Sequence, residues 1–465
     1  MARLPERRRL QGTIRPGGPD WLYLPVEVPA GVGELAVRYR YDRPPTPPGV
    51  PGNALDLGVL DERAEVRGWS GGARDGFTIS GSGATPGYLP GPIGQGTWQV
   101  VLGPYTVDPE GLAWEVEVTL GEGPPGPAFV PDPAPERAAG RGRGWYRGDL
   151  HTHTVHSDGR RTPAELAAAA RAAGLDFIAS TEHNTTSANL GWGAHAGPDL
   201  LVIGGQEVTS RDGHWLAIGL GPGPPVDWRY RAADGALGPV LAGLRERGGL
   251  AVAAHPFYPL PGCGWGFGYQ GLDAVEVWNG PWTPDDEAAL GTWDRLLAAG
   301  AGGRFLPAVA GSDAHGQDDR VGLPHNVVLA DGLDRRSFLA ALAGGRCWLA
   351  GSAAVDLRLE AAAAGRSAGI GERLEVPAGQ EVTVRLEVRG AAGGLARLCG
   401  PGGPVREARL AGDRDMIEWR TTAGAGGWVR AEVRRTQAVE GGPGEMVALT
   451  NPVLLGPPAS GPPPA

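Results

Sequence analysis

The sequence predicts an α/β protein in which a central region of alternating strands and helices is flanked by two β-sandwich-like domains. Three observations lead to this expectation. Residues 10–120 carry short alternating apolar segments between Gly, Pro and Asp turns, without a convincing helical pattern. Residues 144–350 alternate apolar strands with alanine- and leucine-rich helical stretches. After Gly351 the helical stretches stop and short strands return. A chain of 465 residues is long enough for several folding units.

The N-terminal β-sandwich-like domain is expected at residues 1–120. Its clearest strands are Trp21–Val28, Glu34–Tyr41 and Thr97–Leu102, in which apolar and polar residues alternate as on a half-buried sheet. From residue 121 to 143 the composition turns to Gly, Pro, Ala and Arg with almost no large apolar side chain. Such a segment cannot bury a core, so we expect a linker.

The central α/β domain is expected at residues 144–350, with its clearest helix over 163–173. Thr162 is suited to cap this helix, Pro163 to open it, and Glu165 to complete a capping box, while Gly174 can end it. Strands are predicted at 145–153, 175–183, 200–208, 214–220, 250–255, 272–279 and 305–313.

The C-terminal β-rich domain is expected at residues 351–456. Segments 355–360, 381–388, 427–434 and 445–454 have the length and alternation of short strands, which favours a second β-sandwich. Residues 457–465, with the sequence PPASGPPPA, have nothing to bury and are expected to be disordered.

Composition excludes several classes of partner and site. A formal net charge of −10 leaves no basic stripe for nucleic acid or an anionic membrane, so neither partner is expected. Cys263, Cys347 and Cys399 are odd in number and have no paired spacing, which argues against a disulfide framework or a zinc ribbon. The basic N-terminus is followed by no apolar segment, and none elsewhere is long enough for a membrane span. We therefore expect a soluble, cytoplasmic protein.

Histidines are concentrated in the central region. Seven of the nine lie between residues 151 and 255. His151 and His153 stand two apart at the end of a predicted strand, so both imidazoles project from one face and can bind one ion. Asp158 follows in a Ser-Asp-Gly turn. Further ligand-type residues follow or open later predicted strands: His183, Glu207, His214, His255, Asp313 and His315.

These nine residues predict a metal centre with more than one ion. Polar groups at the carboxyl ends of strands in a βα barrel converge on one mouth, where barrel enzymes have their sites. A single tetrahedral zinc accepts about four ligands, so nine imidazoles and carboxylates imply two or three ions and a bridging carboxylate. One such histidine alone would be better explained as a hydrogen-bonded structural residue. We leave His156, His195 and His325 in structural or substrate-facing roles.

The motifs around these residues resemble those of the polymerase-and-histidinol-phosphatase (PHP) superfamily. The ordered set is Gly148-Asp-Leu-His-Thr-His, Ser157-Asp-Gly, Thr181-Glu-His-Asn, Gly205-Gln-Glu, Gly213-His, Ala254-His-Pro and Gly311-Ser-Asp-Ala-His. It covers about residues 145–350. Within the superfamily, the flanking β domains and Ala448-Leu-Thr-Asn-Pro look like the CehA/McbA branch, named for carbaryl hydrolysis.

The resemblance implies a distorted (β/α)7 barrel that holds two or three divalent ions, Zn, Mn or Fe. A first ion would be held by His151, His153, Glu207 and Asp313, a second by Glu207, His214 and His255, and a third by Asp158, His183 and His315, with Glu207 as the bridge. One departure is Glu182, which stands where the family usually has Asp. Its longer arm changes how that position can support the ligands.

The function expected from these residues is metal-dependent hydrolysis of a small molecule by a metal-bridged hydroxide. The leading hypothesis is a phosphoesterase, either a phosphatase or a phosphodiesterase. The alternative is an ester, amide or carbamate hydrolase of the carbaryl-hydrolase type. A third hypothesis, from another class, is a non-catalytic carbohydrate- or protein-binding protein, which would be expected to lack some of the ligands.

Further residues are candidates for catalytic, substrate-binding or supporting roles near the ions. Catalytic roles are expected for Glu207, Asp313 and His255, and Arg160, Asn184 and Asn279 are candidates for holding a substrate oxyanion, with Arg161 beside them. Arg160 and Arg161 are equally consistent with solvated side chains before the helix cap. Asp149 is expected to orient a ligand imidazole. Trp192, Trp265 and Trp278 are candidates either for an apolar pocket wall or for packing.

Overall fold

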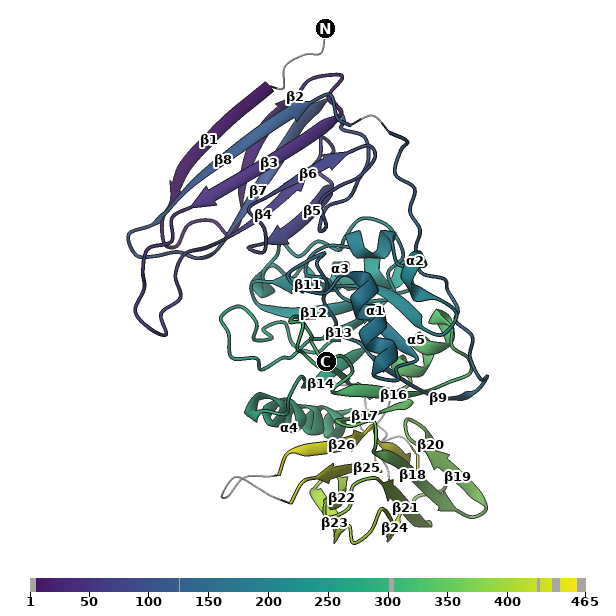
Figure 1. The fold of residues 1–465 in the computed structure, drawn as a ribbon. Coiled ribbons are helices and arrows are strands. Elements are labelled where there is room, and N and C mark those ends of the chain that lie inside the picture. Colours follow the sequence, from purple (N-terminus) through teal and green to yellow (C-terminus); the bar gives the residue numbers. More distant parts are fainter. Residues whose placement is uncertain (1–5, 125, 301–304, 425–426, 437–443, 458–465) are drawn as a thin grey trace.

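A computed structural model describes residues 6–124, 126–300, 305–424, 427–436 and 444–457. The described chain forms three stacked regions, two of strands and, between them, one of strands and helices (Figure 1). The mixed α/β class expected from the sequence is confirmed. Within the described residues no helix combines the length and the apolar character needed to cross a membrane. Cys263, Cys347 and Cys399 are all buried free thiols, as expected.

The N-terminal region consists of two four-stranded antiparallel sheets around one core. Their orders are β1-β8-β3-β6 and β2-β7-β4-β5. Inward side chains of both sheets, such as Val37, Leu57 and Trp98, share one buried cluster. The strands are β1 (Glu6–Ile14), β2 (Leu22–Val28), β3 (Glu34–Tyr41), β4 (Ala54–Leu60), β5 (Val66–Gly71), β6 (Gly76–Ser80), β7 (Gly96–Thr106) and β8 (Leu112–Gly121).

The segment expected to be a linker is held along the side of the central region (Figure 1). The amide of Asp132 donates to the carbonyl of Leu190, and that of Ala138 donates to the carbonyl of Leu333. Ala138 itself is buried in the central core. Low apolar content therefore did not leave this segment free, because its backbone groups found partners on the central region.

The central sheet curls until the segments that follow its first and last parallel strands lie next to each other. Strands β9 (Gly144–Asp149), β10 (Phe177–Ser180) and β11 (Leu201–Ser210) are parallel, as are β13 (Leu250–Ala253), β14 (Ala274–Asn279) and β15 (Ala308–Gly311). Between them, β12 (Gly213–Ile218) is antiparallel to both neighbours. Beyond β9 and β15, Thr152 forms a parallel bridge with Ala314.

This curled sheet does not confirm the distorted (β/α)7 barrel that the resemblance implies. The turn from β11 leads straight into β12 with no helix between them. The other side of β9 pairs with the antiparallel β16 (His325–Ala330), which pairs with β17 (Cys347–Ala350). The described helices of this region are α1 (Pro163–Ala172), α2 (Gly193–Ala196), α3 (Leu237–Glu246), α4 (Pro284–Ala299) and α5 (Arg335–Ala343), with 3₁₀ turns at Ser187–Leu190 and Ala232–Asp234.

Helix α1 forms for the reasons expected from its sequence. The Thr162 hydroxyl accepts from the Glu165 amide, and the Glu165 carboxylate accepts in return from the Thr162 amide, so a capping box closes the N-terminus. Pro163 occupies the first turn, and Leu166 lies fully buried against the sheet side of the helix.

The C-terminal region shares a sheet with the central one. From β17 the hydrogen bonding continues through β26, β25, β22 and β23, while β19, β18, β21 and β24 form a separate four-stranded sheet. No break in this sheet marks the expected boundary at residue 350, and the domain limits stay predictions. The strands are β18 (Asp356–Ala363), β19 (Arg366–Gly369), β20 (Arg373–Leu374), β21 (Glu381–Arg389), β22 (Leu395–Gly400), β23 (Gly403–Arg409), β24 (Arg414–Thr422), β25 (Gly427–Arg434), β26 (Met446–Thr450) and β27 (Val453–Leu455).

The motif Ala448-Leu-Thr-Asn-Pro has a structural role at this junction. The side-chain oxygen of Asn451 accepts from the amide of Ala308 at 2.8 Å, and its nitrogen donates to the carbonyls of Ala308 and Cys347 at 2.9 and 3.0 Å. Asn451 therefore ties the start of β15 to β17. The tail expected to be disordered lies, apart from Pro457, outside the described residues.

Candidate metal centre

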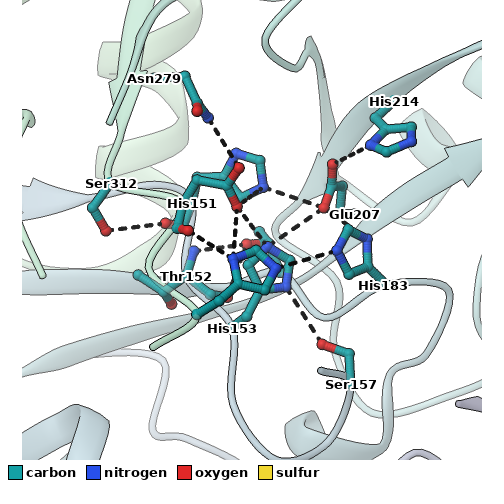
Figure 2. Close-up of polar contacts among 12 residues, drawn as sticks. His151, Thr152, His153, Ser157, His183, Glu207, His214, Asn279 and Ser312 are labelled. Carbon is teal, nitrogen blue, oxygen red and sulfur yellow. Dashed lines mark hydrogen bonds and ion pairs between the residues drawn. The ribbon is translucent and has the colours of Figure 1, made fainter. Parts of the chain in front are cut away.

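The structure brings the nine predicted ligand residues together at one end of the curled sheet. Figure 2 shows His151, His153, His183, Glu207 and His214 close together. His151 and His153 follow β9, His183 follows β10, and His255 follows β13. The remaining positions are Glu207 in β11, His214 at the start of β12, Asp313 and His315 after β15, and Asp158 in the turn before α1. Parallel strands that end at the same edge thus account for most of the convergence.

Two of these ligands lie in a strained backbone conformation. His255 and Asp313 have positive φ angles of 24° and 51°, and the neighbouring Asn184 has 53°. A non-glycine residue adopts such angles only where the surrounding structure compensates for their cost, and functional sites are where they gather.

The contacts between imidazole and carboxylate atoms of the first group have the lengths that a tetrahedral site requires. Nε2 of His151 lies 3.3 Å from both Glu207 Oε2 and Asp313 Oδ1. Nε2 of His153 lies 3.4 and 3.0 Å from the same two oxygens. With metal–ligand distances of about 2.1 Å, the edges of a tetrahedron would be about 3.4 Å long.

The four atoms of this group are also buried and have no hydrogen-bond partner in the part of the chain that the structure describes. Buried polar atoms are rarely left unpaired, because each loses its hydration without compensation. Four such lone pairs around one point fit a bound cation. The positions of these four side chains in the structure, and not only their spacing in the sequence, therefore suit a divalent ion.

The second group lies around both oxygens of the bridging carboxylate, since Nδ1 of His183 lies 2.9 Å from Glu207 Oε2. Nδ1 of His214 and Nε2 of His255 approach Glu207 Oε1 at 2.9 and 3.1 Å. The three residues whose ligand atoms all lie within 4.8 Å of one another here are His183, Glu207 and His214. His255 also lies against Glu207, and its buried Nδ1 has no hydrogen-bond partner among the described residues. The implied set of Glu207, His214 and His255 stays a prediction.

The third group combines the remaining predicted ligands with one from the first. Nε2 of His315 lies 3.2 Å from Asp158 Oδ1 and 3.4 Å from Nε2 of His183. Nε2 of His183 is 3.7 Å from the same Asp158 oxygen, and His153 completes the set. This group is the most exposed of the three, since about half of the Asp158 side chain is accessible.

The electrostatics of the centre favour cations. Burial alone would raise the carboxylate pKa values, but nearby imidazoles hold the pKa values of Glu207 and Asp313 well below their usual range. Burial opposes a charge on His183, yet Glu207 and Asp158 raise its pKa to about 10. In the metal-free protein, protons on such imidazoles balance the carboxylates. Metal binding at the centre should therefore release protons.

Glu276 is a supporting residue that sequence reasoning missed. Its Oε1 faces Nδ1 of His151 at 3.0 Å, and its Oε2 accepts from the amide of His255 at 2.8 Å. A carboxylate that accepts from Nδ1 leaves the Nε2 lone pair of the imidazole free for a metal. A single acidic residue in the otherwise apolar run 274–278 was the available signal.

Glu182, the departure from the family motif, reaches the ligands through a hydroxyl. It accepts from the Ser157 hydroxyl at 2.6 Å and from the Thr154 hydroxyl at 2.6 Å. Ser157 in turn lies 3.4 Å from Nδ1 of His153. The longer side chain thus supports His153 indirectly and ties down the turn that leads to Asp158.

Asp149 requires a correction. Its carboxylate accepts from the backbone amides of His151, Ser312 and Gly322 at 3.1, 3.0 and 2.8 Å, and no imidazole is among its described partners. It therefore orients the two ligand-bearing loops through their backbones, and not a ligand ring.

The residues proposed to hold a substrate oxyanion have different environments in the structure. Asn279 donates to Glu276 at 3.1 Å and to Asp313 at 3.4 Å, so its amide positions a ligand. Both ends of the Asn184 side chain bond to the backbone of Thr209, which favours a structural role. Arg160 is exposed.

Arg161 and the tryptophans are mainly structural. The buried Arg161 donates to backbone carbonyls of the loop after His315. Trp192 is fully buried in the core beneath α1, and Trp265 packs against Phe267. Trp278 alone of the three predicted tryptophans lines the main cavity at the centre.

The three histidines left outside the predicted ligand set lie outside the three groups. His156 lies 2.8 Å from the Ser187 hydroxyl, and His195 packs edge-on against Trp192. His325 is buried, with Nδ1 toward the carbonyl of Gly322 and Nε2 toward Arg147.

The main cavity has a volume of about 980 Å³ and opens directly onto the ligands. His183, His214, His255, Asp313 and His315 form its floor, and strands and loops of the central and C-terminal regions form its walls. Its size suits a small molecule. Fold and site together define a mixed α/β protein with a histidine–carboxylate centre able to hold divalent metal ions.

Comparison with known proteins finds weak similarities, and no protein-family model matches the chain. An uncharacterised protein of Methanocaldococcus jannaschii is 26% identical over 150 residues, which are 29% of this chain and 81% of that protein. A solved two-domain protein of Bacteroides vulgatus, containing a predicted PHP-like metal-dependent phosphoesterase, is 17% identical with a TM-score of 0.37, over 70% of this chain and 100% of that one.

A solved amidohydrolase of Chromobacterium violaceum, with bound sulfate and no metal, is 20% identical with a TM-score of 0.26, over 37% of this chain and 89% of that one. Similarities of this strength do not place the chain in a family. Membership of the PHP superfamily and of its CehA/McbA branch stays a prediction from the sequence.

Proposed function

We propose that this protein is a metal-dependent hydrolase of the PHP type and that its leading activity is hydrolysis of phosphate esters. One observation carries the proposal, and it concerns four buried ligand atoms of His151, His153, Glu207 and Asp313. The contacts between the two imidazole nitrogens and the two carboxylate oxygens are 3.0–3.4 Å long, and none of the four atoms has a hydrogen-bond partner among the described residues. Divalent ions held there would bring the pKa of water toward neutrality and polarise the bond to be cleaved.

The protein's own residues hold this arrangement rigid. Glu207 is fully buried, and its two oxygens face different imidazoles: Oε2 faces those of the first group and His183, and Oε1 faces His214 and His255. Glu276 and Asn279 fix His151 and Asp313 from behind. A preorganised set of ligands avoids reorganisation during the reaction, which is a main source of catalytic power.

Phosphate esters suit this centre because their several oxygens can contact more than one cation. The walls of the main cavity do not select anions by themselves. They carry Arg320 and Arg435, but also Asp285, Asp318, Asp319 and Glu445. Binding of a phosphate group should therefore depend on the ions, and chelation should abolish it.

An ester, amide or carbamate hydrolase is the second candidate. The main cavity has an apolar side formed by Tyr258, Leu260, Trp278 and Trp282, and Leu260 is 58% exposed. Such a surface suits an aryl or alkyl group beside the bond to be cleaved. A non-catalytic binding protein is the third candidate and has less support, because the nine ligand residues are present and most of them converge in compact groups.

A substrate panel with a bridging-ligand variant tests the proposal. The metal-loaded protein is assayed with p-nitrophenyl phosphate, bis(p-nitrophenyl) phosphate and an aryl carbamate, and its metal content is measured. Glu207→Gln should abolish turnover and lower metal content, whereas Glu445→Gln, at the cavity wall, should keep its metal. Near-normal turnover by Glu207→Gln would overturn the assignment, and exclusive cleavage of the carbamate would favour the second candidate.

A further inference from the structure

A second cavity adjoins the metal centre beside the N-terminal sheets. It has a volume of about 430 Å³. Asp56, Trp69 and Tyr105 from the N-terminal region line it, and so do the ligand residues His183 and His214. These two histidines also line the main cavity. The two cavities therefore meet at the metal centre, and the N-terminal region forms a wall of the second.

Arg211, in the turn between β11 and β12, contributes an incompletely paired guanidinium group to this cavity. Its side chain is only 11% exposed, and its Nε and Nη2 have no hydrogen-bond partner in the described residues. The carboxylate of Asp56 lies 3.6 Å from Nη2, too far for a good hydrogen bond. A buried cation with unused donors is costly unless an acceptor is supplied.

Two further donors of the same cavity also lack acceptors. The indole nitrogens of Trp21 and Trp228 are buried and have no hydrogen-bond partner in the described residues. Trp228 packs edge-on against Trp69, so both indoles are held in place. Together with Arg211, three side chains that line this cavity have hydrogen-bond donors without an acceptor among the described residues.

The guanidinium group is held in place by its surroundings. Its carbon lies 4.6 Å from the ring centre of Tyr105, and the Tyr105 hydroxyl bonds to the carbonyl of Pro261. A Cβ at Gly103 would lie 2.8 Å from Trp69 and 3.1 Å from Arg211 Nη2, so glycine allows this close packing. A preorganised guanidinium loses little freedom when it binds a ligand.

We propose that the second cavity binds a negatively charged, acceptor-rich group of the substrate, a carboxylate or a phosphate remote from the cleaved bond, through Arg211. The N-terminal region then takes part in substrate selection, because it supplies the aromatic walls and the surface that holds Arg211. The role in turnover rests on the proposed function, whereas the binding of an anion does not.

Binding of small anions tests the inference without turnover. The protein, with and without Mn²⁺, is titrated calorimetrically with benzoate, with phenylphosphonate and with benzyl alcohol as a neutral control. Arg211→Gln should weaken the tighter of the two anions by about tenfold or more, as expected for loss of a charge-assisted hydrogen bond. Arg320→Gln, which changes a guanidinium of the main cavity only, should not. The ranking of the two anions identifies a carboxylate or a phosphate site.

A second variant changes the binding in the opposite direction. Asp56→Asn removes the negative charge beside Arg211 and should strengthen anion binding severalfold, which a merely structural role of this pair would not produce. Thermal melts check that both variants fold. If Arg211→Gln does not fold, the change in anion affinity of Asp56→Asn tests the inference by itself. No Arg211-dependent binding of either anion, or no gain in Asp56→Asn, would overturn the inference.

Turnover separates this inference from the proposed function. If phosphate esters are cleaved, Arg211→Gln should raise KM for 4-carboxyphenyl phosphate but not for phenyl phosphate, and should leave kcat nearly unchanged. If no ester is cleaved while benzoate binding still depends on Arg211, the proposed function fails and the anion site stands. If esters are cleaved but neither anion binds in an Arg211-dependent way, and Arg211→Gln leaves KM for 4-carboxyphenyl phosphate unchanged, the anion site alone fails.

Discussion

Glu276 offers a sharp test of how the metal centre is supported, because one atom substitution changes its hydrogen bonding. Its Oε1 faces Nδ1 of His151, while its Oε2 accepts from the His255 amide and from Asn279. In Glu276→Gln one of these oxygens becomes an NH₂ group, which can no longer accept. The amide oxygen should take the place of Oε2, where it can still accept from the His255 amide and from Asn279. The NH₂ group then faces His151.

The consequence for His151 can be worked out from this geometry. Nδ1 can accept from the new NH₂ group only if its proton moves to Nε2, which is the atom directed at the first metal position. Metal binding must then restore the other tautomer and leave two donors facing each other. Loss of a hydrogen bond to a charged group costs about 1.5–3 kcal/mol. Variants of such supporting residues lose about 10- to 100-fold in metal affinity, which agrees with that range.

The assay is competition for metal with a chelator of known affinity, together with the metal content after dialysis. Asp273→Asn is the matched control, since Asp273 is a buried carboxylate directly before the same strand that accepts from the Ala251 amide. It should lower the free energy of unfolding and leave metal affinity unchanged. Metal affinity of Glu276→Gln within about twofold of the parent protein, or an equal loss in Asp273→Asn, would refute the reasoning.

Three further predictions address the ligand groups, the packing and the pH dependence. His183→Ala should empty the two groups that share this residue and leave at least one ion bound, as measured by elemental analysis; loss of all metal would contradict the grouping. Gly311→Ala should destabilise the fold by about 1–3 kcal/mol or more and reduce metal content, because its Cβ would lie 2.2 Å from that of His151. Gly243→Ala in α3, with nothing within 4 Å, should instead be neutral or stabilising by up to about 1 kcal/mol in urea unfolding. Burial and Arg147 lower the pKa of His325 from 6.5 to about 4, so the unfolded chain binds this proton more tightly between those values. Stability of the metal-free protein should therefore fall as pH drops through this window, by up to about 1.4 kcal/mol per pH unit, and His325→Gln should flatten that slope; an unchanged slope would show that another group is responsible.

Several parts of the fold could be predicted because local signals agreed with one another. The cap at Thr162, the proline at the first turn and the apolar face of α1 all specify the same helix. Central strands such as β10 and β14 were predicted within a few residues, since a short apolar run between turns has few alternatives.

The pairing of strands that are distant in the sequence was harder to predict. Nothing local shows that β12 runs antiparallel between β11 and β13, or that β17 passes the central sheet on to β26. Strand neighbours depend on backbone hydrogen bonds between residues far apart in sequence, and apolar periodicity is the same for either direction.

By itself, the sequence determined which residues could serve as metal ligands, because imidazoles and carboxylates seldom recur by chance, in order, at the ends of successive strands. Which of them lie close together depends on tertiary contacts: His183 lies with Glu207 and His214, and His153 lies with Asp158, His183 and His315. The tertiary structure also revealed Glu276 behind His151 and Arg211 beside Asp56, which no motif marks. The physical reason is that a residue type limits the chemistry a side chain can perform, whereas its partner is set by distances of a few ångströms that arise only when the whole chain is packed.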